Sequence, residues 1–60
     1  MKIRVLVVED EPPIQRSICQ KIEESNENYI VVAAIDNGKD AMQYLKEHPV
    51  DVMFVDMKEW

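Results

Sequence analysis

The sequence is poor in the residues that cross-link, break or bend a small protein. It has a single cysteine, Cys19, which excludes an internal disulfide and agrees with a reducing compartment. One glycine and three prolines exclude a collagen-like or low-complexity chain. No apolar run approaches the roughly 20 residues that cross a membrane, and the acidic residues 9–11 interrupt the apolar start before a secretory signal could form. We therefore expect a cytoplasmic protein without a membrane partner.

Positive charge is also scarce. The chain of 60 residues has 7 Lys and Arg against 12 Asp and Glu, so its net charge is −5. Nucleic-acid binding needs clusters of Lys and Arg on phosphate groups, so we expect no direct nucleic-acid contact. Hydrophobic residues make up 47% of the chain, which favours one folded domain at residues 1–60 over disorder. A domain of this size buries only about 60% of its unfolded surface, so its stability is marginal.

What the sequence does contain is an alternation of strand and helix patterns. Runs rich in Val and Ile indicate strands that are apolar on both faces. Ile14, Ile18 and Ile22 recur every four residues, which is typical of an amphipathic helix, and two prolines suit its first turn. The expected elements are strands at 3–8, 29–35 and 52–55, and helices at about 12–25 and 38–47.

The second helix has a recognisable start and an apolar side. Asn37 can cap it, and Asp40 three residues later completes a pattern similar to a capping box. Ala41 and Leu45, together with Met42 and Tyr44, supply the apolar side. Pro49 excludes a continuation past residue 48, so the helix is expected to end near residue 47.

Strands that alternate with helices predict a parallel α/β sheet. Crossover connections between parallel strands are right-handed in about 98% of cases. If the first strand lies in the middle, in the order 2-1-3, the two crossovers run in opposite directions and place the two helices on opposite faces. The winding then reverses between the first and third strands. Ligands bind outside the carboxyl ends of the strands at such a switch point.

Acidic residues follow both strands at this point. Glu9 and Asp10 come directly after the first strand, and Asp56 directly follows the third. Neighbouring strands lie about 4.8 Å apart, so we expect the three carboxylates to converge at one edge of the sheet. Close carboxylates repel each other and favour a bound cation, and oxygen ligands favour Mg²⁺, Mn²⁺ or Ca²⁺ over zinc. A carboxylate in such a site can also be the nucleophile that forms an aspartyl phosphate.

Three segments of the sequence resemble the receiver domain of response regulators. Residues 7–12 (VVEDEP) resemble its strand, acidic pair and helix start, and residues 36–41 (DNGKDA) resemble the opening of its second helix. Residues 50–58 (VDVMFVDMK) resemble its phosphoacceptor strand. The resemblance covers essentially the whole chain but only the N-terminal half of a receiver. It implies a flavodoxin-like α/β fold with the same 2-1-3 strand order.

The resemblance also implies a role for each acidic residue. Asp56 accepts a phosphoryl group from the phosphohistidine of a sensor kinase. Asp10 and Glu9 bind Mg²⁺, and the backbone carbonyl of Lys58 completes the metal site. The protein is then a phosphoacceptor in a two-component phosphorelay and not an enzyme. The family also uses a Thr or Ser after a fourth strand and a Lys after a fifth. These 60 residues contain neither segment, so we expect impaired phosphorylation.

Other interpretations stay open on the residues alone. The chain could be a truncated or engineered half-domain whose activity is self-association or pairing with a complementary fragment. It could also be a small cation-binding module, or its acids could be solvated surface carboxylates. We expect Asp51 to be solvated and Glu11 to supply charge at the helix start. Two helices cannot cover both faces of three apolar strands, and the third strand would be an open edge. Because apolar open edges pair with another strand, we expect a homodimer through that edge.

Overall fold

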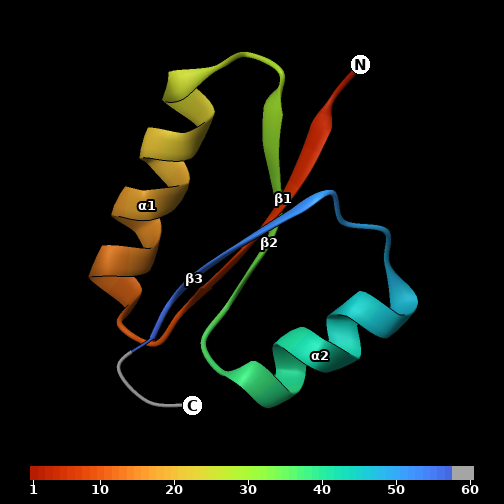
Figure 1. Ribbon diagram of the computed structural model, residues 1–60. Coiled ribbons are helices and arrows are strands. Elements are labelled where there is room, and N and C mark those ends of the chain that lie inside the picture. The colour runs from red at the N-terminus through yellow and green to blue at the C-terminus, as the bar shows by residue number, and fades with distance from the viewer. Residues whose placement is uncertain (58–60) are drawn as a thin grey trace.

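The computed structural model describes residues 1–57 and has the predicted alternation of strands and helices (Figure 1). The predicted boundaries agree with the structure, except that the first and third strands each extend by one residue to include an acidic residue. The elements are β1 (Ile3–Glu9), α1 (Pro12–Ser25), β2 (Tyr29–Ile35), α2 (Gly38–Glu47) and β3 (Val52–Asp56).

The three strands form one parallel sheet in the order β2-β1-β3, as predicted. In the β1–β3 pair, Val5 lies opposite Val52 and Glu9 lies opposite Asp56. The β1–β2 pair contains an irregularity that the sequence pattern does not predict, because the register shifts between Val5 and Leu6. The order and direction of the strands are those of the N-terminal half of a flavodoxin-like fold.

The two helices lie on opposite faces of the sheet, as the right-handed crossovers predict (Figure 1). Alternate residues of β1 point to opposite faces. Leu6 and Val8 pack in one cluster with Ala41 of α2, whereas Val5 shares an apolar hollow with Ile22 of α1. Both helices lie closest to β1 and β2, and Ile22 of α1 borders β3 across the hollow that it lines with Val52 and Phe54.

Local sequence signals fix where the helices begin. Pro12 and Pro13 occupy the first turn of α1, where the absence of a backbone N–H has no cost. The Asn37 side chain accepts a hydrogen bond from the Asp40 backbone N–H at 2.8 Å, which confirms the predicted cap of α2. The Asp40 carboxylate in turn accepts from the Asn37 side-chain amide at 3.0 Å. The helix start that borders the site is thereby held in place.

Burial is concentrated in β1. Its residues Val5–Val8 are at most 3% exposed, whereas β2 and β3 are half-buried or exposed. The two helices cover little more than the central strand, in agreement with the expectation that they cannot cover both faces of three apolar strands. For the same reason Ile14 and Met42, expected on the apolar sides of the helices, are 41% and 55% exposed. Within the described residues, neither helix has the length and apolar character needed to span a bilayer.

The amino end of the β1–β3 pair contains an ion pair that the sequence analysis missed. Asp51 was expected to be solvated, but one of its carboxylate oxygens accepts from the Arg4 backbone N–H at 2.8 Å and from Arg4 Nε at 3.2 Å. The other oxygen accepts from Arg4 Nη2 at 3.4 Å. Both side chains remain close to half exposed. Arg4, a charged residue inside an apolar strand and one position before the Val5–Val52 pair, was the signal that could have predicted this ion pair.

Candidate functional site

The site lies at the carboxyl ends of β1 and β3, where the direction of winding reverses. Glu9 is the last residue of β1 and Asp56 is the last residue of β3, and the two are direct partners in the parallel ladder. Asp10 follows Glu9 in the loop that leads into α1. The predicted strand order therefore brings residues 9, 10 and 56 to one edge of the sheet, although 46 positions separate Asp10 from Asp56 in the sequence.

Glu9 is the most constrained acidic residue of the site. It is 3% exposed, and it is the one charged residue buried in the described chain. Its carboxylate accepts a hydrogen bond from the Glu11 backbone N–H at 3.2 Å, and its backbone carbonyl accepts from the Gln15 side-chain amide at 3.1 Å. Gln15 holds the end of β1 against the first turns of α1, a contact that periodicity alone does not reveal.

The electrostatics of this end disfavour a charged Glu9. Burial raises the pKa of the Glu9 carboxyl, and the nearby charges of Asp56 and Asp10 raise it further. The hydrogen bond from the Glu11 backbone opposes this rise in pKa without cancelling it. A buried carboxylate that faces other carboxylates needs a proton or a cation to compensate its charge.

The chemistry of the donor atoms fits a hard divalent cation. Carboxylate oxygens of Glu9, Asp10 and Glu11 can all lie within 4.8 Å of one another. Asp56 is outside this group, although its charge acts on Glu9 from the neighbouring strand. Oxygen donors without Cys or His suit Mg²⁺, Mn²⁺ or Ca²⁺. Lys58, whose carbonyl the resemblance assigns to the metal, lies outside the described residues.

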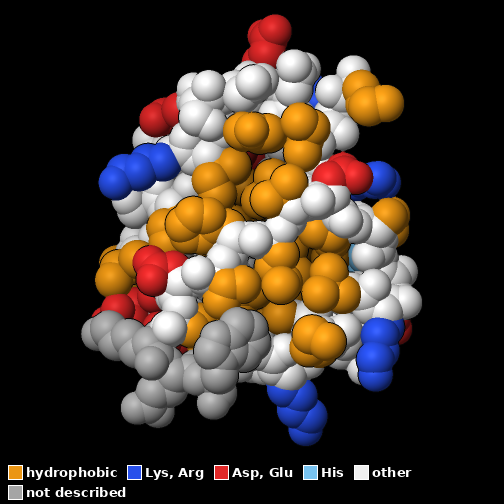
Figure 2. All heavy atoms as spheres, viewed as in Figure 1, with side chains coloured by type: hydrophobic (Ala, Val, Ile, Leu, Met, Phe, Trp, Pro, Cys, Tyr) orange, Lys and Arg blue, Asp and Glu red, His pale blue; other side chains and the backbone are white. Residues whose placement is uncertain are grey.

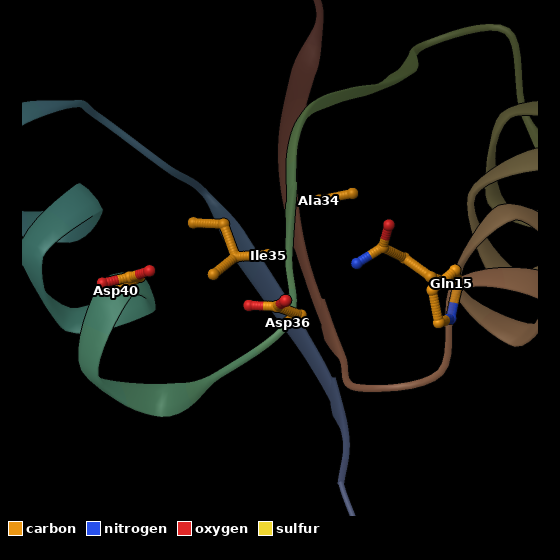
Figure 3. A pocket seen from close by; sticks show the side chains of 6 residues that line it. Gln15, Ala34, Ile35, Asp36 and Asp40 are labelled. Atoms are coloured by element: carbon orange, nitrogen blue, oxygen red, sulfur yellow. The ribbon is translucent and has the colours of Figure 1, made fainter.

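Two hollows open at this edge of the sheet. The larger, about 630 Å³, is lined by Asp10, by Met57 next to Asp56, and by the start of α2 around Lys39. The smaller, about 340 Å³, lies between the two helix starts. Figure 3 shows Gln15 extending from α1 toward the strands, with Asp36 at the end of β2 between it and Asp40 of α2.

The comparison with family models gives a match over residues 5–58 to the response regulator receiver domain. The chain belongs to this family. The match spans both strands that carry Glu9 and Asp56 and the loop that carries Asp10, so the resemblance seen in the three segments is confirmed. The present chain covers an N-terminal piece of a receiver domain, with three of its parallel strands.

Three curated proteins are similar in sequence to the chain. It is 40% identical over 53 residues to a probable C4-dicarboxylate response regulator of Priestia megaterium, covering 88% of this chain and 23% of the relative. It is 39% identical over 57 residues to a protein-glutamate methylesterase/protein-glutamine glutaminase of Clostridium acetobutylicum, covering 95% and 16%. It is 33% identical over 58 residues to the fimbriae Z protein of Salmonella typhimurium, covering 97% and 28%.

The receiver segment is thus a small part of each relative. The chain spans between 16% and 28% of the length of these proteins. No solved structure matches the chain significantly. What the relatives share with this chain is the receiver segment, and the activities in their names belong to the whole proteins.

Proposed function

We propose that the chain is a receiver-type phosphoacceptor, in which Asp56 takes up a phosphoryl group next to a divalent cation bound by Asp10 and Glu9. The observation that carries the proposal is the Glu9–Asp56 pair at the switch point. Glu9 is 3% exposed there, with a raised pKa. Acidic residues without a ligand-binding role rarely occupy so buried a position among like charges.

The proposed reaction is an in-line displacement at phosphorus. An Asp56 carboxylate oxygen attacks the phosphorus of a phosphoramidate donor such as phosphohistidine, the P–N bond breaks, and the nitrogen leaves with a proton. The products are an acyl phosphate on Asp56 and a free imidazole. Asp56 is exposed and next to the larger hollow, so the donor can approach without local unfolding.

The cation proposed for this site is Mg²⁺. When bound, it would offset the negative charge that the phosphoryl group adds to three nearby carboxylates. Asp10 and Glu9 would supply side-chain oxygens, Asp56 would contribute through its own carboxylate, and the Lys58 carbonyl would complete the set. Glu11 is a further oxygen donor that the sequence analysis did not assign to the metal.

The family favours a sensor histidine kinase as the phosphoryl donor and the cytoplasm as the location. The proposed role is signal transduction by covalent modification and not catalysis on a separate substrate.

Intact-mass measurement after incubation with phosphoramidate and Mg²⁺ tests the proposal. The expected result is addition of one phosphoryl group to the native chain, none to Asp56→Asn, and an unchanged yield for Asp51→Asn. Asp51 is the matched control, because it lies just before the opposite end of β3 and is paired with Arg4. Phosphate on the Asp56→Asn chain, or none on the native chain with millimolar Mg²⁺, would rule the proposal out.

A further inference from the structure

The loop between β1 and α1 places three acidic residues side by side. One carboxylate oxygen from each of Glu9, Asp10 and Glu11 lies within 4.8 Å of the other two. Figure 2 shows acidic side chains near the end of the sheet where β1 leads into α1 in Figure 1. Carboxylates at this separation repel each other, so the loop keeps them together only where its backbone is held in place.

The start of α1 is fixed in a different way from the start of α2. The side chain of Glu11, the residue before α1, does not cap the helix, whereas Asn37 caps α2. Pro12 and Pro13 occupy the next two positions and have no backbone N–H that could donate to the loop. The Gln15 backbone N–H donates to the Glu11 carbonyl at 2.8 Å. This hydrogen bond attaches the last residue of the loop to the helix.

The Gln15 side chain attaches the other end of the loop. Its Nε2 donates to the Glu9 backbone carbonyl at 3.1 Å, and Figure 3 shows the side chain extending from α1 toward the strands. Gln15 thus holds the first and the last residue of the loop, with Asp10 between them. A third hydrogen bond crosses the loop, from the Glu11 backbone N–H to the Glu9 carboxylate at 3.2 Å. Together these three hydrogen bonds close residues 9–11 into one compact turn.

We propose that Gln15 is a positioning residue of the acidic site, whose side-chain amide holds the Glu9 carbonyl so that the acids of the loop meet a divalent cation in a fixed arrangement. The inference rests on the proposed function, since the cation is the one proposed there next to Asp56. Gln15 contacts the backbone of the loop and not the reacting atoms, so it acts through Glu9 and Asp10.

Charge separates the role of Gln15 from that of the acids. Its amide is neutral, so removing it leaves the net charge of the site unchanged. Its contribution is to limit the conformations of the loop before the cation binds, which reduces the entropy lost on binding. Mg²⁺ demands near-octahedral geometry, whereas Ca²⁺ accepts more flexible arrangements of oxygen donors. Loss of the Gln15 amide is therefore expected to weaken the binding of Mg²⁺ more than that of Ca²⁺.

Isothermal titration calorimetry of Gln15→Met with Mg²⁺ and with Ca²⁺ tests this role. Met keeps the length and the helix propensity of Gln but has no N–H donor. The affinity for Mg²⁺ is expected to fall about tenfold, as is typical when a residue that orients a metal ligand is lost, and the affinity for Ca²⁺ about threefold or less. Equal affinities of the native and Gln15→Met chains, or equal losses for the two cations, would overturn the proposal.

Gln20→Met is the matched control on the same helix. The Gln20 amide also makes a side-chain hydrogen bond, but its acceptor is the Glu24 carboxylate at 3.1 Å, within α1 and away from the loop. Gln20→Met is expected to leave both cation affinities unchanged. A loss of Mg²⁺ affinity as large as that of Gln15→Met would contradict a specific role of Gln15.

Hydrogen exchange in the metal-free chain gives a readout that needs no cation. The Glu11 backbone amide is expected to exchange about threefold faster or more in Gln15→Met, because opening of the loop breaks its bond to Glu9. Unchanged exchange would contradict the positioning role. If circular dichroism shows that Gln15→Met is unfolded, Gln15→Ala replaces it, and loss of structure in both variants would show a purely structural role and overturn the proposal.

The same measurements separate a failure of this inference from a failure of the proposed function. A native chain that binds no Mg²⁺ at millimolar concentration would overturn the proposed function, and the positioning role with it. Binding of Mg²⁺ to the native chain that Gln15→Met leaves intact would overturn the positioning role alone.

Discussion

Both ends of the β1–β3 pair contain a carboxyl group whose pKa is shifted, but the two shifts have opposite directions. At the amino end, hydrogen bonds from Arg4 lower the pKa of Asp51. At the carboxyl end, burial and neighbouring carboxylates raise the pKa of Glu9. One end is therefore stabilised by its charges and the other is destabilised by them. The difference bears on the proposed function, because a bound cation would compensate the crowded acids at the carboxyl end, whereas Asp51 at the amino end is already paired with Arg4.

Exposure reinforces this contrast. Asp51 is 43% exposed and fully paired, whereas Glu9 is 3% exposed and lies among carboxylates. A small domain with few buried residues can keep a buried carboxylate such as Glu9 only if the loss of stability that it causes is modest. If the carboxyl end is the proposed phosphoacceptor site, its cost in stability is of the kind that functional sites commonly carry.

The largest expected effect is the loss of the fold itself, which would abolish the difference between the two ends of the β1–β3 pair. Leu6 is 0% exposed and lies in β1 between them, so Leu6→Ala is expected to cost about 3 kcal/mol of unfolding free energy. In so small a domain this loss is sufficient to unfold the chain, and both pKa shifts should return to ordinary values. Urea titration followed by circular dichroism measures the loss. Met42→Ala, at a 55% exposed residue, should stay within about 0.5 kcal/mol, and an equal loss in both would refute the assignment of the core.

The next effect distinguishes the two ends by metal binding. Asp10→Asn removes a charged oxygen donor from the carboxyl end, so Mg²⁺ affinity is expected to fall roughly tenfold or more, since ligand charge controls the affinity for hard cations. Asp51→Asn removes the same charge from the amino end and should leave the affinity unchanged. Isothermal titration calorimetry of both variants checks this. Equal loss in the two would mean that net charge, and not a site, attracts the cation.

The sequence predicts the secondary-structure elements and their order better than it predicts individual side-chain contacts. The strand and helix boundaries follow from periodicity and from the cap at Asn37, and handedness gives the order that unites Glu9 with Asp56. These are repeated or local signals. The Arg4–Asp51 pair and the Glu9–Gln15 contact depend on exact register and side-chain direction, which no local pattern encodes. The exposure of Met42 on α2 depends on how much of the sheet lies beneath that helix, which the helical pattern alone does not give.

A third prediction reverses the usual expectation for a charge-removing mutation. The folded pKa of Glu9 lies above its ordinary value of 4.5, so the folded state holds the proton more tightly than the unfolded state. Stability contributed by this residue is complete below pH 4.5 and is lost as pH rises through the folded pKa. Glu9→Gln should therefore be more stable than the native chain at pH 7 and lose that advantage in acid.

Urea unfolding across the pH range measures this difference, and saturating Mg²⁺ supplies the control. The cation is expected to stabilise the native chain more than Glu9→Gln, because it compensates the charge that the variant lacks. A Glu9→Gln chain that is less stable than the native chain at pH 7 without metal would show that the carboxylate is well compensated by its hydrogen bonds. The proposed functional character of this end would then lose its electrostatic basis.

The smallest expected effect has the opposite sign and the opposite pH dependence. The folded pKa of Asp51 lies below its ordinary value of 3.8, so its contribution is present above that pH and is lost as pH falls through the folded pKa. Asp51→Asn should be slightly less stable than the native chain at pH 7 and equal to it in strong acid. The deficit should be small and should shrink in high salt, because both partners of the pair are nearly half exposed. A double-mutant cycle with Arg4→Gln isolates the coupling between them. If Asp51→Asn instead matched Glu9→Gln in sign, the two ends would not differ in kind, and the contrast between them would reduce to a general excess of negative charge.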